Sequence, residues 1–146
     1  MCNKVEIVES RPGIIKLSDN TTLTLKITII DAREVGFSPF GGVHIAVKAV
    51  GGISTKNVPH ELREKVSDKP LATSQIPKDG WELIDIREQE EACEKVKIDT
   101  SRGKFLVNVR AEATMAARNM QYKNEFNEPI YMLSWVYKVS WRPVRE

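Results

Sequence analysis

Apolar and polar side chains alternate most clearly over residues 21–35, which read TTLTLKITIIDAREV. Four aliphatic residues recur at every second position and therefore share one face of an extended strand: Leu23, Leu25, Ile27 and Ile29. Threonine and isoleucine are branched at Cβ, which also favours a pleated backbone. The pattern predicts a long strand with one buried face.

Shorter segments show the same period of two. Residues 4–9 and 14–17 predict two short strands joined by a turn, and residues 43–50, VHIAVKAV, predict another strand. The doublet Gly51–Gly52 is typical of a two-residue hairpin turn, so residues 53–58 are expected to form the returning strand.

The middle of the chain combines a helix, a connector and a further strand. Residues 59–66, PHELREKV, predict one or two helical turns, because a proline precedes a run of helix-forming residues. Residues 67–80 contain two prolines and predict an exposed connector. Residues 81–88, WELIDIRE, predict another strand.

The last third of the chain predicts one long hairpin, with strands over residues 104–122 and 130–141. Alternate positions place Phe105, Val107, Val109, Ala111 and Ala113 on one face of the first strand. The corresponding face of the second strand carries Tyr131, Leu133, Trp135, Tyr137, Val139 and Trp141. Residues 110–121 also fit a helical stripe of residues that favour helices, but of the two the strand is favoured.

Together these segments predict a mainly β fold, an antiparallel sandwich or partly closed barrel of about seven or eight strands with one or two short helices. A split α+β arrangement is the alternative. A chain of 146 residues predicts one β-rich domain, residues 1–146, with the proline-containing connector at 67–80 exposed.

Composition narrows the classes of protein that fit. With 41% apolar and 29% charged residues, the chain resembles a folded globular protein rather than a disordered one. Its apolar runs are short and its first ten residues have no secretory signal pattern, so we expect no membrane partner and a cytoplasmic location. The cysteines Cys2 and Cys93 show neither zinc-site nor disulfide-framework spacing, and no cofactor is expected.

The net charge of +2 conceals two segments of opposite sign. Residues 79–99 contain eight acidic and three basic side chains, whereas residues 102–146 contain eight basic and four acidic ones. Such segments can pair with a second copy or a polar partner, although two solvated faces are the favoured interpretation of the charges alone. Long hairpins also expose long edge strands, which another chain often covers. The leading hypothesis is therefore a non-catalytic binding module, a homodimer or assembly subunit that associates through its β edges.

A second hypothesis comes from aromatic and basic residues near the end of the chain, and it concerns single-stranded nucleic acid. Bases stack on aromatic rings while lysine and arginine bind phosphates. The residues that would bind a single strand are Trp135, Tyr137, Lys138, Trp141, Arg142 and Arg145. The same aromatic row also contains Leu133 and Val139, so the core face of the last strand is the favoured interpretation. The small net charge does not favour strong, salt-dependent binding.

A third hypothesis comes from two similar six-residue segments, IIDARE at residues 29–34 and LIDIRE at residues 83–88. Paired carboxylates can perform acid–base chemistry or hold a divalent cation. Each aspartate is accompanied by an arginine, which would lower the carboxyl pKa rather than raise it. The residues of this charge cluster are Asp31, Arg33, Asp85 and Arg87. Two solvated strand ends are favoured over an enzyme site, so no catalytic residue or metal ligand is assigned.

Overall fold

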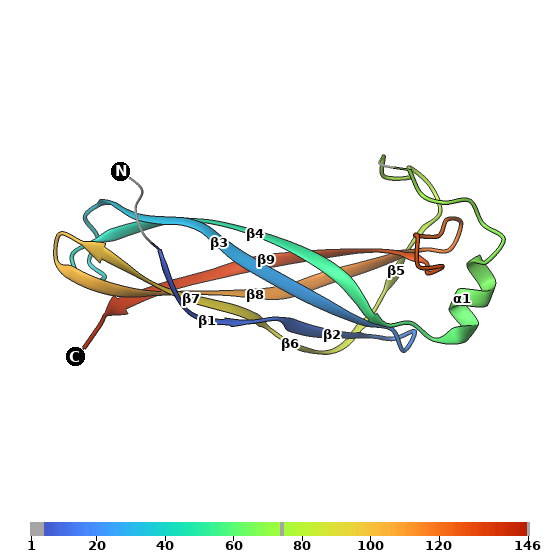
Figure 1. The fold of residues 1–146 in the computed structure, drawn as a ribbon, viewed down its shortest axis with the longest axis horizontal. Coiled ribbons are helices and arrows are strands. Elements are labelled where there is room, and N and C mark those ends of the chain that lie inside the picture. Colours follow the sequence, from blue (N-terminus) through green and yellow to red (C-terminus); the bar gives the residue numbers. More distant parts are fainter. Residues whose placement is uncertain (1–4, 74, 146) are drawn as a thin grey trace.

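The computed structural model describes residues 5–73 and 75–145, which form an elongated sandwich of two antiparallel sheets (Figure 1). The five-stranded sheet contains β1 (Glu6–Arg11), β7 (Ala92–Thr100), β8 (Gly103–Asn119), β5 (Trp81–Ile84) and β9 (Ile130–Pro143). The four-stranded sheet contains β4 (His44–Asn57), β3 (Thr22–Gly36), β2 (Gly13–Leu17) and β6 (Ile86–Glu90). Helix α1 is His60–Val66. The mainly β fold is confirmed as a sandwich, and neither sheet closes into a barrel within these residues.

The core lies between the two sheets and is built from the apolar rows that the alternation predicts. Every member of the β3 row is buried, and so is every member of the β8 row. The core therefore follows directly from the period of two. A buried carboxylate also links the sheets: Glu94 of β7 accepts a hydrogen bond from the backbone N–H of Ile29 at 2.7 Å and one from the hydroxyl of Ser10 at 3.0 Å.

One long side of the sandwich is closed by the chain itself. β1 continues into β2, and β6 continues into β7, so each segment passes from one sheet to the other. β1 pairs with β7, and β2 pairs with β6. Gly13 stands at this crossing, where an added Cβ would lie 2.7 Å from the backbone nitrogen of Ala92 and 2.8 Å from the carbonyl oxygen of Glu90. The close approach of the two crossing segments therefore requires a glycine.

The opposite long side is formed by two edge strands that are not paired with each other. Over the residues that the structure describes, β4 pairs only with β3, and β9 pairs only with β8. Both strands run almost the full length of the sandwich (Figure 1). This side therefore exposes one free strand edge from each sheet.

The hairpin turn predicted at Gly51–Gly52 is wrong. A single strand, β4, continues through both glycines, and these pair with Ile27 and Lys26 of β3. Packing explains the glycine at position 51, because an added Cβ would lie 2.7 Å from the ring of Trp135. Glycine is needed here for room, not for a turn.

The single strand predicted over residues 81–88 is also wrong. The segment forms two strands that belong to different sheets, since β5 pairs with β8 and β6 pairs with β2. The chain changes sheets at Asp85, whose carbonyl oxygen accepts a hydrogen bond from the backbone N–H of Ser18 at 2.9 Å. Apolar alternation continues across the change of sheet, which is why the sequence pattern does not reveal it.

Most of the remaining predicted elements agree with the structure, but the turn predicted between the first two strands is wrong: only Pro12 separates β1 from β2, and the chain passes there from one sheet to the other. Residues 110–119 belong to strand β8 rather than to a helix, and α1 occupies the predicted helical segment. The connector at 67–80 contains no strand or helix among its described residues and is largely exposed. It contacts the β8–β9 loop through an isolated bridge between Leu71 and Lys123.

Candidate functional site

The free edge of β9 carries most of the residues that the sequence singles out. Successive side chains of a strand point to opposite faces, so the odd-numbered aromatic residues face β4 and the even-numbered cations lie on the outer face of the sheet. Trp135, Tyr137 and Trp141 are thus separated from Lys138 and Arg142 by the thickness of the strand. Arg145 lies beyond the end of β9 and is exposed.

Two of the aromatic residues are fixed against the second sheet. Trp135 packs over Gly51 of β4, and both Trp135 and Trp141 pack against the core. The indole N–H of Trp141 donates to the carbonyl oxygen of Phe40 at 2.9 Å, and its ring meets that of His44 edge-to-face with centroids 5.7 Å apart. Both indole rings are therefore held in structural contacts. The aromatic row of β9 lies mainly at the edge of the core, where it is only partly buried.

The cation in the middle of β9 is directed back across its own sheet. The ammonium of Lys138 donates to Glu91 at 3.1 Å and to Glu112 at 3.2 Å. The hydrogen bonds to Glu91 and Glu112 raise the pKa of Lys138 above its usual value. Lysines that project from an edge strand discourage pairing with another chain, but this lysine is held over the face of the sheet instead.

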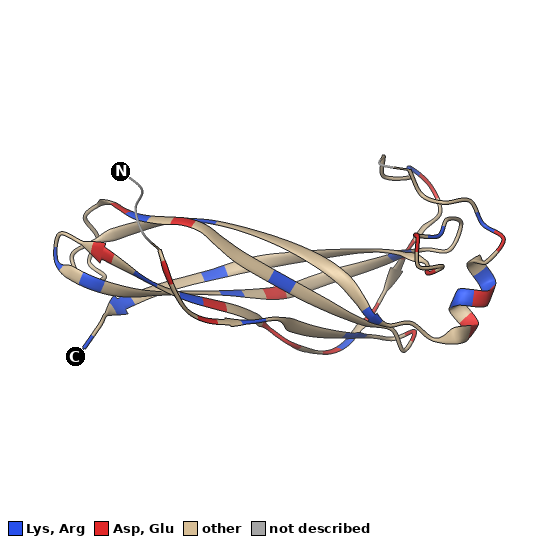
Figure 2. Ribbon diagram, in the orientation of Figure 1, with Lys and Arg blue, Asp and Glu red and all other residues tan. Residues whose placement is uncertain are grey.

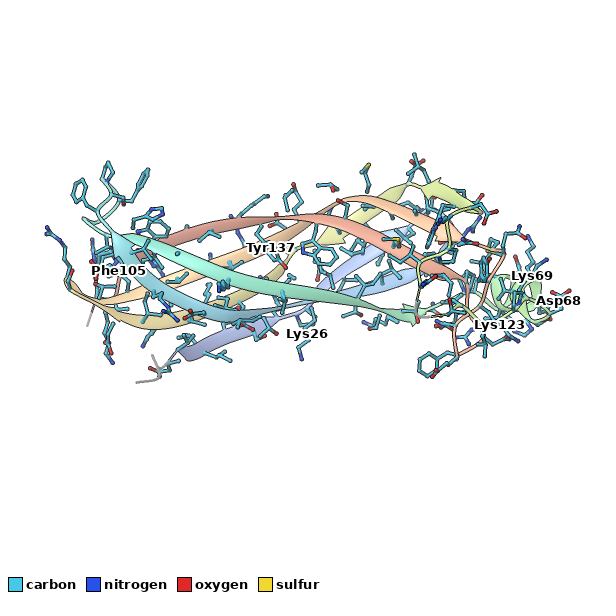
Figure 3. The ribbon with its side chains drawn as sticks, turned by 90° about the horizontal axis from the view of Figure 1, so that it is seen from above. Lys26, Asp68, Lys69, Phe105, Lys123 and Tyr137 are labelled. Carbon is cyan, nitrogen blue, oxygen red and sulfur yellow. The ribbon has the colours of Figure 1, made fainter. Side chains whose placement is uncertain are left out.

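Several apolar side chains remain exposed along β9. Val136 and Val139 are 47% and 44% exposed, and Tyr137 is 38% exposed (Figure 3 labels Tyr137). The free edge of β4 differs, because its outward-facing Lys48 and Lys56 form no ion pair with any described residue. Arg142 of β9 likewise forms no ion pair with any described residue, but it lies next to the end of that strand. Of the two free edges, the middle of β9 is therefore the less protected against strand addition.

The structure does not bring together the four residues of the charge cluster. Arg33 binds Asp31 on its own strand, with a 2.8 Å hydrogen bond from Nε to Oδ2. Arg87 instead donates to Asn20 at 3.0 Å, and no ion pair to Asp85 forms. No ion pair or hydrogen bond therefore joins the charged residues of IIDARE to those of LIDIRE in the described chain.

The two aspartates also lie far apart. Ile86 pairs with Leu17, so its neighbour Asp85 is level with the beginning of β3 near Thr22. Asp31 lies nine residues further along that strand, which is roughly 30 Å at about 3.3 Å per residue. Asp31 and Asp85 cannot share one ligand in this structure. Over residues 5–73 and 75–145, no group of three or more His, Cys, Asp or Glu side chains is placed to hold a metal ion.

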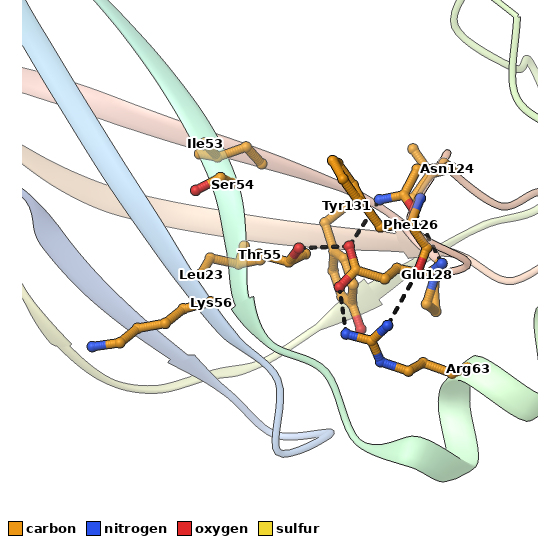
Figure 4. A pocket seen from close by; sticks show the side chains of 12 residues that line it. Leu23, Ile53, Ser54, Thr55, Lys56, Arg63, Asn124, Phe126, Glu128 and Tyr131 are labelled. Atoms are coloured by element: carbon orange, nitrogen blue, oxygen red, sulfur yellow. Dashed lines mark hydrogen bonds and ion pairs between the residues drawn. The ribbon is translucent and has the colours of Figure 1, made fainter.

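A cavity of about 660 Å³ opens at the end of the sandwich that carries α1 (Figure 4). Glu128 is the buried acidic residue of the cavity wall, with a side chain that is 5% exposed. Its carboxylate binds Arg63 of α1 at 3.0 Å. Thr55 and Asn124 donate to the same carboxylate at 2.6 and 3.0 Å. Since Arg63 also donates to the carbonyl oxygen of Phe126 at 3.1 Å, these polar groups are occupied in fastening α1 to the β8–β9 loop.

A second buried cluster lies behind this cavity and fixes the β2–β3 turn. The hydroxyl of Tyr131 donates to Asp19 at 2.7 Å and lies 2.8 Å from the hydroxyl of Thr21. Arg118 binds the same aspartate at 3.1 Å and also pairs with Glu82. Burial raises the pKa of Tyr131 above its usual value, so this hydroxyl stays protonated and serves as a structural donor.

Comparisons with protein-family models, with curated proteins and with solved structures find no match. No helix of the described chain is long and apolar enough to cross a membrane. Cys93 is buried in β7, and Cys2 lies outside the described residues.

Sequence reasoning missed two features at the ends of the sandwich. The first is the cluster that joins α1 to Glu128, because nothing in the sequence links residues 65 positions apart. The second is the loop at residues 37–43, which presents Phe37 and Phe40 to solvent. Two phenylalanines within a segment rich in glycine and proline, GFSPFGG, were a signal for the second feature.

Proposed function

We propose that the protein is a non-catalytic interaction module that forms a homodimer through the free edge of β9. The observation that supports this proposal is a 14-residue strand that, over residues 5–73 and 75–145, pairs on one side only, with β8. A free edge exposes backbone N–H and C=O groups that can pair with another strand. We assign the module to the cytoplasm, as its sequence suggests.

A second copy of this chain is the partner that the edge fits best. Antiparallel pairing of two identical strands is what a two-fold axis generates, so β9 of each copy can serve as the partner of the other. The exposed side chains of Val136, Tyr137 and Val139 lie near the middle of the strand and would be covered by such pairing. Lys138 does not oppose it, because its ammonium is bound over the face of the sheet.

The test is sedimentation velocity of the wild-type protein and of two matched variants. Val136→Lys brings like charges close to each other across the two-fold axis and should dissociate the dimer. Val50→Lys is the control, because Val50 is 51% exposed on the other edge strand and Val136 is 47% exposed. We expect a species of twice the 16.5 kDa chain mass for wild type and Val50→Lys, and a monomer for Val136→Lys. A monomeric wild type, or dissociation by Val50→Lys alone, would contradict the proposal.

The nucleic-acid hypothesis receives less support from the geometry. Stacked bases need phosphate-binding cations beside the rings, whereas Trp135 and Tyr137 lie on the opposite face of β9 from Lys138. A site shared by Asp31 and Asp85 is not supported either, because the two carboxylates lie far apart. Both hypotheses stay predictions, and the free edge of β9 is the better-supported site.

A further inference from the structure

The end of the sandwich opposite α1 presents two phenylalanine rings to solvent. Phe37 and Phe40 are 75% and 72% exposed, and both belong to the loop at residues 37–43 between β3 and β4. Neighbouring exposed aromatic rings on one loop often mark a surface that binds a partner.

Hydrogen bonds and packing hold this loop in place. The exposure of the two rings is therefore not the result of a poorly fixed backbone. The hydroxyl of Ser38 accepts a hydrogen bond from the backbone N–H of Phe40 at 3.1 Å, and Trp141 donates to the carbonyl oxygen of Phe40 at 2.9 Å. Gly41 has a φ of 79°, and a Cβ at this position would lie 2.9 Å from the ring of buried Phe105 (Figure 3 labels Phe105). The backbone is thus anchored to the core while the two phenylalanine side chains point away from it.

Basic residues lie at the same end of the sandwich as the two rings. Arg102 lies in the β7–β8 turn, with its side chain 2.7 Å from where a Cβ on Gly42 would stand. The backbone N–H of Val144 donates to the carbonyl oxygen of Lys104 at 2.9 Å, which holds the following Arg145 beside the same turn. Figure 2 shows blue segments at this end together with some red ones, and both colours around α1.

These cations make no direct ion pairs within the described chain. They are Arg102, Lys104, Arg142 and Arg145. Glu34 of β3 reaches the turn, and its two oxygens accept hydrogen bonds from Ser101 at 2.8 and 2.7 Å. Asp99 is the other nearby acid, opposite Lys104 in the β7–β8 register. Among the described residues named here, four cations stand against two carboxylates, and they lie at the same end as the exposed apolar rings.

We propose that this end docks on an anionic lipid bilayer. Phe37 and Phe40 enter the boundary between headgroups and acyl chains, while Arg102, Lys104 and Arg145 contact the anionic headgroups. Interfacial binding combines burial of apolar side chains with attraction of cations to acidic lipids, and both components are present on this single surface. Such docking requires no membrane-spanning segment, so it does not depend on the long apolar runs that the sequence lacks.

The opposite end of the molecule provides an internal comparison. Phe126 is 73% exposed, which matches Phe37 and Phe40. Its surroundings are different, because Arg63 is paired with Glu128 and α1 carries acidic and basic side chains together. Exposed aromatic area is thus similar at the two ends, and the excess positive charge distinguishes the docking end.

The test is co-sedimentation with vesicles of phosphatidylcholine, with and without about one third phosphatidylserine, at low salt. We expect wild type to bind the anionic vesicles at least tenfold more tightly than the neutral ones. The double variant Phe37→Ser/Phe40→Ser should weaken that binding at least tenfold, and Arg102→Gln alone roughly fivefold. Phe126→Ser, the matched control, should bind as wild type does. Thermal unfolding of each variant confirms that it is folded.

Three results would overturn the proposal. The first is no wild-type binding to anionic vesicles at low salt. The second is equal loss of binding in Phe126→Ser and in the double variant. The third is binding of a single-stranded oligonucleotide, but not of vesicles, that the double variant abolishes. None of these results bears on β9, because the self-association test uses neither lipid nor the loop at residues 37–43.

Discussion

Gly51 and Gly52 are adjacent in β4, but they have different neighbours. A Cβ on Gly51 would lie 2.7 Å from the ring of Trp135, while one on Gly52 would have no atom within 4 Å. We predict that Gly51→Ala lowers the free energy of unfolding by about 1–3 kcal/mol, because it overpacks the contact between the sheets. Gly52→Ala should be neutral or stabilise by up to about 1 kcal/mol, because it reduces the entropy of the unfolded chain. Urea denaturation of both variants measures the difference, and equal effects would contradict this packing.

Glu34 links the long strand β3 to the β7–β8 turn. Hydrogen bonds from the backbone N–H and the hydroxyl of Ser101, with Arg102 nearby, lower the pKa of Glu34. A carboxyl whose pKa is lower in the folded state stabilises the fold above its unfolded pKa, about 4.3, and loses that contribution as the pH falls through the folded value.

We therefore predict that Glu34→Gln is less stable than wild type at pH 7. The difference in unfolding free energy should shrink as the pH falls below about 4, because both proteins are then uncharged at this position. Chemical denaturation across this pH range measures it. A difference for Glu34→Gln that does not change with pH would show that its charge has no role.

At the scale of elements, α1 depends on contacts outside itself. It has seven residues, and isolated helices shorter than about 12–15 residues are only marginally stable in water. Two of its own side chains, Leu62 and Val66, are buried, and its Arg63 binds the buried carboxylate of Glu128. This ion pair fastens α1 to the β8–β9 loop and forms one wall of the cavity.

We predict that Glu128→Ala raises the rate of amide hydrogen exchange in α1 at least tenfold. The substitution leaves the guanidinium of Arg63 without its partner, at a cost of about 2 kcal/mol, since that side chain is 38% exposed. Glu64→Ala is the control, because Glu64 pairs only with His60 and both of these side chains are well exposed. Exchange in α1 that is equally fast in both variants would show that the Glu128 pair does not hold the helix.

Strand alternation predicted most of the elements from the sequence. The buried rows of β3 and β8 could be identified because each one follows a strict period of two within one sheet. The change of sheet at Asp85 could not be identified, since the apolar pattern continues across it. The sequence predicts a turn at Gly51, whereas β4 continues through it. Glycine is needed at this position to make room for Trp135, which lies 84 positions later in the sequence.

The candidate sites were less predictable than the fold. The period of two places Trp135 and Lys138 on opposite faces of β9. The sequence pattern alone therefore indicates that the aromatic rings and the cations do not share one surface. The distance between Asp31 and Asp85 depends on strand order, which no local pattern encodes. The ordered loop that carries Phe37 and Phe40 depends on the packing of Gly41 against Phe105, a contact between distant segments.

At the scale of the whole molecule, the sandwich is closed along one side and exposes two free strands along the other. Closure comes from β1–β2 and β6–β7, which pass between the sheets, while β4 and β9 remain free edges. Antiparallel pairing of β9 with a second copy would place the loops at residues 37–43 at opposite ends of the dimer. Each dimer would then present one lipid-binding end in each direction, with the joined sheet between them.

The most direct measurement of the central claim is amide hydrogen exchange in β9 at two protein concentrations. If the free edge of β9 joins two copies, its outward-facing amides are protected at high concentration and exchange faster on dilution, while those of β4 do not change. Exchange in β9 that is rapid and independent of concentration would contradict self-association through this edge. Concentration-dependent protection of β4 instead would place the interface on the other free strand.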